Sequence, residues 1–317
     1  MKKILIAGGA GYIGCALVPA LKSRGYDVKV VDLCMFGNNL PPGTPLLGID
    51  LFDLDFRDLE GFDTVIFMAG LSNDPMADYS PSQNFIQNSA APAFLAYEAK
   101  RARVKRFIYA SSASVYGDCS GEMASEYCGG TYPVFPYGLS KLQGELAVLS
   151  MADENFSVFA LRKGTVSGYS PRMRLDLLVN AMFKSAFDTG TIFVNDPAVY
   201  RPVLSIQDAV QAYIRAVEAP EDLAGVFNIA SGNYTIAQVA EQVAARVPMS
   251  HPPTVEVVGK KDMRNYRMSI KRAIRELGFE PTGSVWSILE DLIDNKHKFS
   301  DWDNKRYYNI EVFKGIK

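Results

Sequence analysis

The sequence predicts an α/β fold in which a doubly wound parallel sheet is followed by a smaller α/β region toward the C-terminus. Short runs rich in Val, Ile and Phe alternate with helical segments over residues 1–163. Strands that are separated by helices pair in parallel, and helices cover both faces of such a sheet. The second observation is a cluster of four glycines, GGAGYIG at residues 8–14, between the first run and the first helix.

Each element follows from its own local pattern. The expected strands are KKILIAG, DVKVVD, TVIFMA, RFIYAS and VFALR, at residues 2–8, 27–32, 64–69, 106–111 and 158–162. The expected helices between them cover residues 12–24, 81–103 and 136–151. Beyond residue 162 the pattern loosens, with a helix at 174–188, a strand near 192, the strand VFNI at 226–229 and an amphipathic helix at 235–247.

These elements predict two domains. Residues 1–163, joined by late elements near 201–230, are expected to form the first domain, and residues 164–200 and 231–317 the second.

Composition excludes several classes of protein. The chain has 317 residues, a net charge of −2 and 48% hydrophobic residues, which gives no reason to expect nucleic acid or a membrane as partner. The four cysteines form no CxxC pair, so we expect reduced thiols and a cytoplasmic protein; they are Cys15, Cys34, Cys119 and Cys128. The two histidines, His251 and His297, lack a ligand-spaced partner, so no metal site is expected.

The glycine cluster has the chemistry of a phosphate-binding turn. Gly8, Gly11 and Gly14 give a GxxGxxG spacing, which allows a tight turn and lets the backbone approach a pyrophosphate at a helix N-terminus. Asp32 ends the next strand, 18 residues beyond Gly14, where a carboxylate accepts hydrogen bonds from both ribose hydroxyls and repels a 2′-phosphate. The sequence therefore predicts a Rossmann-type domain that binds NAD in preference to NADP. Asp50, with Leu51 beside it in GIDLFD, is a weaker candidate for the adenine amino group.

A possible general base lies in FPYGLSK, residues 135–141. Tyr137 and Lys141 are four residues apart and share one face of the helix that starts near Pro136. A phenol has a pKa near 10, and a neighbouring ammonium together with an oxidised nicotinamide ring would lower it. The pair would thus serve as a base without histidine. Ser112, in YASSASVYG at a strand end, is best placed to hydrogen-bond the reacting hydroxyl.

The sequence resembles the extended short-chain dehydrogenases/reductases that modify nucleotide sugars, from Lys3 to about Leu292. The motifs that carry the resemblance are GGAGYIG, GIDLFD, FMAGLSNDP, SSASVYG, YGLSK, LRKGTVSGYSPRM, RPVLSIQD and RNYRMS. The resemblance implies a Rossmann domain with tightly held NAD, a smaller domain that grips a nucleoside diphosphate, and a homodimer formed through the helices at 81–103 and 136–151.

The resemblance also implies roles for individual residues. Ser112, Tyr137 and Lys141 would be catalytic. The implied cofactor-binding set is Gly8, Gly11, Tyr12, Ile13, Gly14, Asp32, Asp50, Leu51, Ala69, Gly70, Asn88 and Lys141, with Asn88 supporting the active-site helix. The implied substrate-binding set is Ser112, Tyr137, Thr165, Asn180, Arg201 and Arg264, with Arg267 as an alternative to Arg264.

Departures from the family pattern narrow the range of reactions that this chain is expected to catalyse. The 4,6-dehydratases place Asp-Glu after the catalytic hydroxyl, and the decarboxylating members keep the Glu, whereas this chain has Ala113 and Ser114, which cannot supply that acid. Thr165 stands where the family has a substrate-binding Asn, and Lys163 replaces a residue that usually packs beside the nicotinamide.

These observations favour NAD-dependent oxidation of a nucleotide-sugar hydroxyl, at C4, by an epimerase. A C4 dehydrogenase or ketoreductase with the same site is the alternative, and a non-catalytic NAD-binding sensor is a third reading. The aromatic ending WDNKRYYNIEVF could cover the substrate cleft, contact another subunit or fray.

Overall fold

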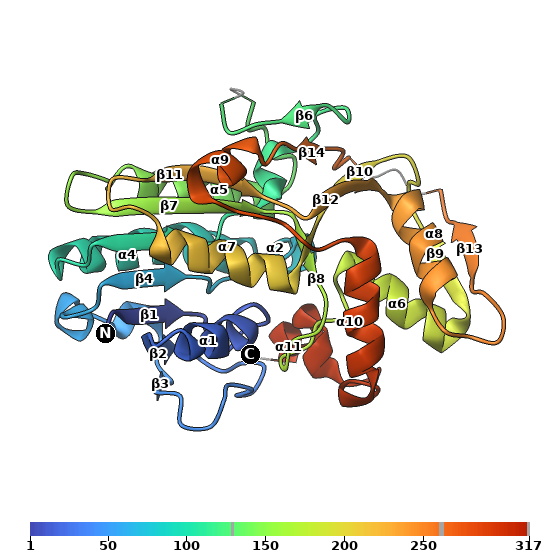
Figure 1. The fold of residues 1–317 in the computed structure, drawn as a ribbon, viewed down its shortest axis with the longest axis horizontal. Coiled ribbons are helices and arrows are strands. Elements are labelled where there is room, and N and C mark those ends of the chain that lie inside the picture. The colour runs from blue at the N-terminus through green and yellow to red at the C-terminus, as the bar shows by residue number, and fades with distance from the viewer. Residues whose placement is uncertain (128–129, 260–262, 316–317) are drawn as a thin grey trace.

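A computed structural model describes residues 1–127, 130–259 and 263–315, so Cys128 lies outside the described residues. Its largest sheet has the strand order β11-β7-β5-β4-β1-β2-β3, and every described pairing in it is parallel (Figure 1). In chain order these strands are β1 (Lys3–Ala7), β2 (Asp27–Val31), β3 (Leu46–Leu47), β4 (Thr64–Phe67), β5 (Arg106–Tyr109), β7 (Ser157–Lys163) and β11 (Gly225–Ile229). The doubly wound parallel sheet expected from the sequence is confirmed.

Alternating side chains of the strands enter two different cores, as the two-residue period of a strand requires. Ile4 and Ile6 of β1 pack with α1 (Gly14–Ser23) and α7 (Ile206–Glu218) on one face. Leu5 and Ala7 of the same strand pack on the other face. The helices of that second face are α4 (Ala91–Arg101) and α5 (Pro136–Leu149). Burial on both faces explains why these strands are continuously apolar rather than alternating.

The smaller region lies beyond β7, on the right of Figure 1. Its three-stranded sheet joins β8 (Thr165–Ser167), β10 (Tyr200–Ser205) and β12 (Gly232–Thr235), and β9 (Thr191–Val194) pairs with β13 (Thr254–Val257). The helices α6 (Leu178–Thr189), α8 (Ile236–Arg246) and α10 (Val285–Asn295) pack on one another. A further short sheet pairs β6 (Met123–Ala124) with β14 (Arg267–Met268), and α9 (Lys271–Leu277) packs beside β11.

The segment expected as one long helix at 81–103 has three parts. It runs through α3 (Pro81–Phe85), a π-helical turn (Ile86–Ala90) and α4, and it is preceded by α2 (Asp74–Tyr79). Asn88 lies in the π-helical turn, and its carbonyl oxygen accepts a hydrogen bond from the Tyr109 hydroxyl at 2.9 Å. The extra residue of a π turn redirects the chain locally, which a sequence periodicity of 3.6 cannot reveal.

The helix expected at 174–188 begins only at Leu178. Arg174 lies in the segment before the helix, where its guanidinium forms a two-bond ion pair with Asp176 at 2.8 and 2.9 Å and the neighbouring Leu175 N–H donates to the distant Tyr307 carbonyl. In the parts of the chain that are described, no helix is both long and apolar enough to cross a membrane.

The C-terminal residues run back across the larger domain. The backbone N–H of Leu175 donates to the Tyr307 carbonyl at 2.9 Å, and α11 (Asn309–Gly315) packs on α2, where the rings of Phe313 and Tyr79 are 6.0 Å apart. Trp302 belongs to an aromatic cluster with Phe183, Phe187 and Phe299. One residue of the tail, Asn309, lines the cavity described next.

Candidate active site

A cavity of about 470 Å³ lies at the C-terminal ends of β1, β4, β5 and β7, where a parallel sheet presents its ligands. The predicted site residues that line it are Gly8, Gly11, Tyr12, Ile13, Gly14, Ala69, Gly70, Ser112, Tyr137, Lys141, Thr165, Arg201 and Arg264. The predicted residues outside its described lining are Asp32, Asp50, Leu51, Asn88 and Asn180.

The glycine turn forms a cradle that only glycine fits. Gly8 has φ +82°, and a Cβ there would lie 2.4 Å from the Ala69 nitrogen. A Cβ at Gly14 would lie 2.2 Å from the Gly9 carbonyl oxygen. The helix α1 starts at Gly14, and among the described residues no side chain caps it. Backbone N–H groups at this N-terminus therefore suit the pyrophosphate of a dinucleotide, so the residues present fit NAD.

Asp32 is fixed beside the cradle rather than on the cavity wall. One carboxylate oxygen accepts from the Ala10 N–H at 2.9 Å and the other from the Cys34 N–H at 2.8 Å. Burial raises the pKa of Asp32, and these two backbone hydrogen bonds oppose that rise. The carboxylate thus joins the glycine turn to the loop after β2. This is the position from which it would accept hydrogen bonds from the ribose hydroxyls of the cofactor.

Asp50 and Leu51 have a local role in the structure. Asp50 is the N-cap of a short 3₁₀ helix (Leu51–Asp53), with its carboxylate accepting from the Phe52 N–H at 3.0 Å. Leu51 is buried in the core between the sheet and α4. Neither residue is part of the described cavity lining, and the adenine contact expected for Asp50 stays a prediction.

Asn88 holds the active-site helix instead of contacting the cavity. Its amide nitrogen donates to the Leu71 carbonyl at 3.0 Å, to Asn84 at 2.9 Å and to the Ser140 hydroxyl on α5 at 3.2 Å. Ser140 is next to Lys141, so Asn88 ties the loop after β4 to the helix that carries the predicted base. The cofactor-binding role expected for Asn88 is corrected to this positioning role.

Asn180 makes its hydrogen bonds inside the protein. Its oxygen accepts from the Gly168 N–H at 3.0 Å, and its nitrogen donates to the Arg174 carbonyl at 2.8 Å and the Tyr12 hydroxyl at 3.1 Å. Asn180 is fully buried. It orients the segment that carries Arg174, and the diphosphate contact expected for it stays a prediction.

The three predicted catalytic residues meet at the cavity. Ser112 follows β5 as the N-cap of a 3₁₀ helix (Ala113–Tyr116), and it lines the cavity together with Tyr137 from the start of α5. Lys141, one turn along α5 and only 4% exposed, places its ammonium nitrogen 4.3 Å from the centre of the Tyr109 ring. The end of a strand therefore fixes Ser112, and a helix fixes Tyr137 and Lys141.

The pKa values in this cluster are shifted mainly by burial. Removal from water raises the pKa of Tyr137 to about 12, while the hydrogen bond from Ser112 and the charge of Arg174 act against that rise. Burial and the charge of Lys163 lower the pKa of Lys141 well below its usual range. The sequence predicts a lowered pKa for the phenol; in the protein by itself desolvation outweighs the cationic neighbours. A positive charge brought by a ligand would lower the pKa of Tyr137, in the opposite direction to burial.

A buried ion pair beneath the site was not anticipated from the sequence. Glu145 on α5 forms an ion pair with Arg162 of β7 at 2.5 Å and accepts from the Ser111 hydroxyl. Arg162 also donates to the Tyr116 hydroxyl at 2.9 Å. Because Glu145 lies one turn after Lys141, this network locks the register of α5 against the strands. Glu145 directly follows the close-packed Gly144, but the spacing of residues in the sequence does not indicate that Arg162 is its partner.

The cavity lining is strongly basic. Among the described residues, six basic side chains line it against three acidic ones: Arg172, Arg174, Arg201, Arg264, Lys141 and Lys163 against Asp74, Asp176 and Asp196. The chain as a whole carries −2. A cavity of this charge in a near-neutral protein favours ligands with several negative charges.

The two predicted substrate arginines approach from the smaller region. Arg201 of β10 lies 5.6 Å from the centre of the Tyr266 ring and donates to the Tyr200 carbonyl at 2.9 Å. Arg264 forms an ion pair with Asp74 at 2.7 Å. Arg267 instead donates to the Gly121 carbonyl and lies outside the described lining, so the geometry favours Arg264 over Arg267 at the cavity.

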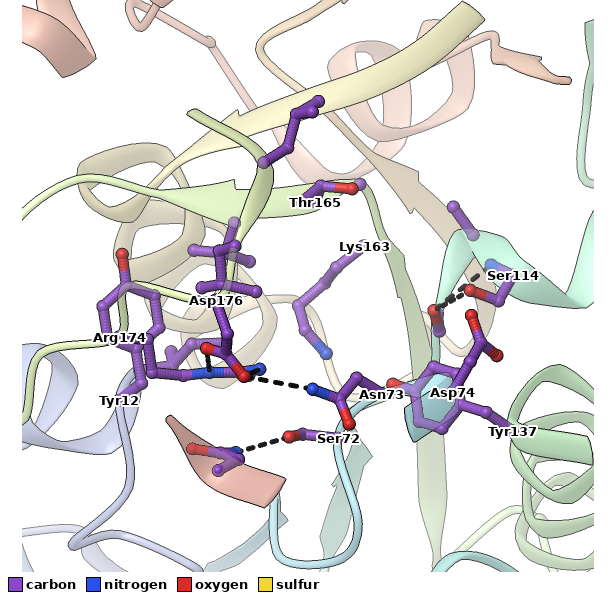
Figure 2. A pocket seen from close by; sticks show the side chains of 18 of the residues that line it. Tyr12, Ser72, Asn73, Asp74, Ser114, Tyr137, Lys163, Thr165, Arg174 and Asp176 are labelled. Atoms are coloured by element: carbon purple, nitrogen blue, oxygen red, sulfur yellow. Dashed lines mark hydrogen bonds and ion pairs between the residues drawn. The ribbon is translucent and has the colours of Figure 1, made fainter. Parts of the chain in front are cut away.

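Sequence reasoning missed the residues of the SPRMRLD segment and the tail. Arg172 lies 3.9 Å from the centre of the Phe36 ring and donates to the Asn309 amide oxygen, and Asn309 in turn donates to the Ser72 hydroxyl at 2.6 Å. Figure 2 shows Arg174 and Asp176 facing Asn73, which donates to Asp176 at 3.1 Å. The run LRKGTVSGYSPRM was noted as a motif, but only the folded chain shows which of its arginines reach the cavity.

Disulfides and metal clusters are not seen in the described part of the chain. Cys15, Cys34 and Cys119 carry no disulfide there. Within residues 1–127, 130–259 and 263–315, no three His, Cys, Asp or Glu side chains lie close enough to hold a metal ion.

Comparison with known proteins agrees with this site. The family model "NAD dependent epimerase/dehydratase family" matches residues 4–230. The chain is 25% identical to a UDP-glucose 4-epimerase of Neisseria meningitidis serogroup C, over 92% of this chain and 96% of that one. It is 27% identical to a UDP-glucose 4-epimerase of Corynebacterium glutamicum, over 93% of this chain and 98% of that one.

Among solved structures, MoeE5 in complex with UDP-glucuronic acid and NAD superimposes with a TM-score of 0.82 at 26% identity, over 94% of this chain and 99% of that one. The match spans both the large sheet and the smaller region. From the family match, the glycine cradle and the parallel sheet together, this chain belongs to the NAD-dependent epimerase/dehydratase family and is an extended short-chain dehydrogenase/reductase that uses NAD.

Proposed function

We propose that this enzyme oxidises the C4 hydroxyl of a nucleoside-diphosphate sugar and then reduces the ketone from the opposite face, so that the net reaction is epimerisation. The observation that supports it is that Ser112, Tyr137 and Lys141 line one basic cavity together with the glycine cradle. The two relatives above, both UDP-glucose 4-epimerases, and the UDP-glucuronic acid complex of MoeE5 support a nucleotide sugar as substrate.

The residues have distinct parts in this reaction. NAD, when bound, supplies the hydride acceptor. Ser112 would hold the reacting hydroxyl, and Tyr137 would take its proton, for which the phenol must first lose its own. The charge of Arg174 favours the phenolate, and a protonated Lys141 would do the same, against the burial that raises the pKa of Tyr137 to about 12.

The smaller region would hold the nucleoside diphosphate. Arg264, within residues 231–317, and Arg201, on the adjoining strand β10, both line the cavity. The glycine cradle lies in residues 1–163. We therefore keep the division into a cofactor domain and a substrate domain as part of the proposal. A guanidinium can bind phosphate oxygens with two hydrogen bonds, which suits both arginines.

A dehydratase reaction is disfavoured by the residues after the catalytic serine. Ala113 is buried and cannot transfer a proton, and the Ser114 hydroxyl lies 3.2 Å from that of Ser112. Elimination needs an acid at these positions, so oxidation followed by reduction is the better-supported chemistry.

The reaction is tested with sugar nucleotides labelled with deuterium at C4. The purified enzyme is incubated with UDP-glucose and UDP-glucuronic acid, and products are separated and analysed by mass spectrometry and NMR. An epimerase returns the label to C4 of the inverted sugar without accumulating NADH. Net formation of NADH with a ketone product would identify the dehydrogenase alternative instead, and bound NAD without any turnover across UDP-, GDP- and CDP-sugars would support the non-catalytic sensor.

A homodimer is part of the same proposal. The π-helical turn, α4 and α5 expose apolar side chains, which are Ile86, Tyr97, Leu139 and Leu146. Size-exclusion chromatography with light scattering should give the mass of two chains, and Leu146→Glu should shift it toward one.

A further inference from the structure

Lys163 is a second amine in the reaction centre, and no part of the proposed mechanism uses it. It is the last residue of β7 and pairs in a parallel bridge with Ser112, the proposed catalytic serine. Figure 2 shows its side chain pointing into the cavity between Arg174 and Tyr137. Its amine donates to the Ser111 carbonyl at 2.9 Å.

This amine has no anionic partner in the described chain. Among the described residues Lys163 forms no ion pair, whereas Arg174 is paired with Asp176 and Arg264 with Asp74. The groups that face it are Lys141 and Tyr137 from α5, Tyr109 from β5 and Tyr213 from α7, with Arg174 and Asp176 across the cavity. Two amines so close to each other disfavour a proton on both at once.

The position of Lys163 relative to Ser112 decides which ligand group it meets. A hydride passes only between carbons that are about 3–3.5 Å apart. The carbon of the hydroxyl held by Ser112 and Tyr137 therefore needs the acceptor ring in the same part of the cavity. That ring is a cation when oxidised and neutral when reduced, and Lys163 is the unpaired amine at this end of the site.

We propose that Lys163 couples the redox state of the bound cofactor to a proton, being neutral beside the oxidised ring and an ammonium beside the reduced one. This proposal rests on the proposed function, which identifies NAD as the hydride acceptor. In the oxidation the C4–H bond would break and its electron pair would leave with the hydrogen for the acceptor, while the hydroxyl proton would pass to the Tyr137 phenolate. The positive charge of the ring and the negative charge of the phenolate would then be lost together. Lys163, no longer beside a cationic ring, would take up one proton from solvent, which stabilises the reduced cofactor and favours the oxidising direction.

The pH range of this coupling follows from burial. Desolvation lowers the pKa of Lys163 from its usual value near 10.5 to about 7. The oxidised ring pushes that pKa lower still, and the reduced ring does not. Burial raises the pKa of each neighbouring tyrosine above the neutral range, so these phenols do not titrate between pH 6 and 9. The pKa of Lys141 is also lowered, by burial and by the charge of Lys163, so a comparison between variants is needed to isolate Lys163.

The test is the ratio of the dissociation constants of NAD⁺ and NADH, measured by fluorescence or calorimetry on the full chain at pH 6 and pH 9. A protonated Lys163 weakens binding of NAD⁺ but not of NADH, so the wild-type ratio should be at least tenfold larger at pH 6 than at pH 9. In Lys163→Met the ratio should lose most of this pH dependence, and at pH 6 NAD⁺ should bind better relative to NADH than in the wild type.

Controls separate the possible outcomes. Lys163→Gln keeps a donor for the Ser111 carbonyl and should behave like Lys163→Met, which guards against a packing effect in one variant. Lys105→Met removes an exposed lysine that pairs with Glu221 far from the cavity and should retain the wild-type ratio at both pH values. A ratio that responds to pH equally in the wild type and both Lys163 variants overturns the proposal, as does an effect of the variants on nucleotide-sugar binding alone. Failure of the wild type to bind either cofactor would instead contradict the proposed function.

Discussion

At the scale of single residues, the active site combines groups whose ionisation is opposed by burial. Tyr137 has a raised pKa and Lys141 a lowered one, and both shifts are caused first by removal from water. Burial thus acts against the phenolate and against the ammonium alike, and a positively charged ligand would oppose it at Tyr137 and add to it at Lys141. The arginines at the other walls are held by fixed partners, so their charge is available from the start.

The first prediction concerns the proposed base. Tyr137→Phe keeps the ring in the cavity lining but removes the hydroxyl proposed to take the substrate proton. Turnover should fall by about 10²–10⁴-fold, the usual contribution of a general acid–base group, while the dissociation constant for NAD changes little. Steady-state kinetics on a verified sugar nucleotide and cofactor titration measure the two effects. Near-wild-type turnover would mean that another group takes the proton.

The second prediction concerns the diphosphate. Arg201→Ala should weaken binding of the nucleotide sugar by about 10- to 100-fold, because a hydrogen bond to a charged group contributes about 1.5–3 kcal/mol. NAD binding should hardly change, because Arg201 lies on β10 of the three-stranded sheet whereas the glycine cradle follows β1 of the large sheet. Calorimetry with UDP, GDP and CDP measures both, and Arg24→Ala, at an exposed ion pair with Glu218, is the matched control. Unchanged affinity for every nucleotide that the wild type binds would make Arg201 structural.

At the scale of elements, the site depends on how closely α5 approaches the π-helical turn. A Cβ at Gly144 would lie 2.1 Å from the Asn88 carbonyl oxygen and 2.7 Å from the Tyr109 hydroxyl. The two segments meet because Gly144 has no side chain, and the hydrogen bonds of Asn88 then fix Ser140. The strands and most helices follow from sequence because they depend on local periodicity. The π turn, the Glu145–Arg162 pair and the true start of α6 depend on contacts between distant residues, so periodicity could not predict them.

The third prediction tests that approach. Gly144→Ala places a methyl group against backbone that cannot move aside, so it should destabilise the protein by about 1–3 kcal/mol, as overpacking of a core does. It should also lower turnover, because α5 carries Tyr137 and Lys141. Thermal unfolding and kinetics measure the two effects. Gly48→Ala, where no atom lies within 4 Å of the added methyl group, should change neither. Equal behaviour of the two variants would contradict the argument.

At the scale of the whole molecule, the cofactor cavity is completed by residues from opposite ends of the chain. Asn309, in the last described helix, bridges Arg172 and Ser72 and lines the cavity that begins at Gly8. The sequence could place the glycine turn and the YxxxK pair, because each is a short motif with its own chemistry. It could not place Asn309, which is 137 residues from Arg172 and belongs to no motif.

The last prediction follows from this closure. A chain that ends at Tyr308 retains Trp302 and its aromatic cluster, since Tyr308 donates to the Trp302 carbonyl at 2.8 Å, but it loses Asn309 and the Phe313–Tyr79 contact. The Arg172 guanidinium then loses its amide partner and the cavity opens on that side. We expect NAD to dissociate at least about tenfold faster, with only a small fall in the unfolding temperature, because the cores of both domains remain intact. Stopped-flow fluorescence of bound NADH and thermal unfolding measure the two effects, and Asn309→Ala should show part of the faster release. Unaltered release in both variants would mean that the tail packs on the cavity without retaining the cofactor.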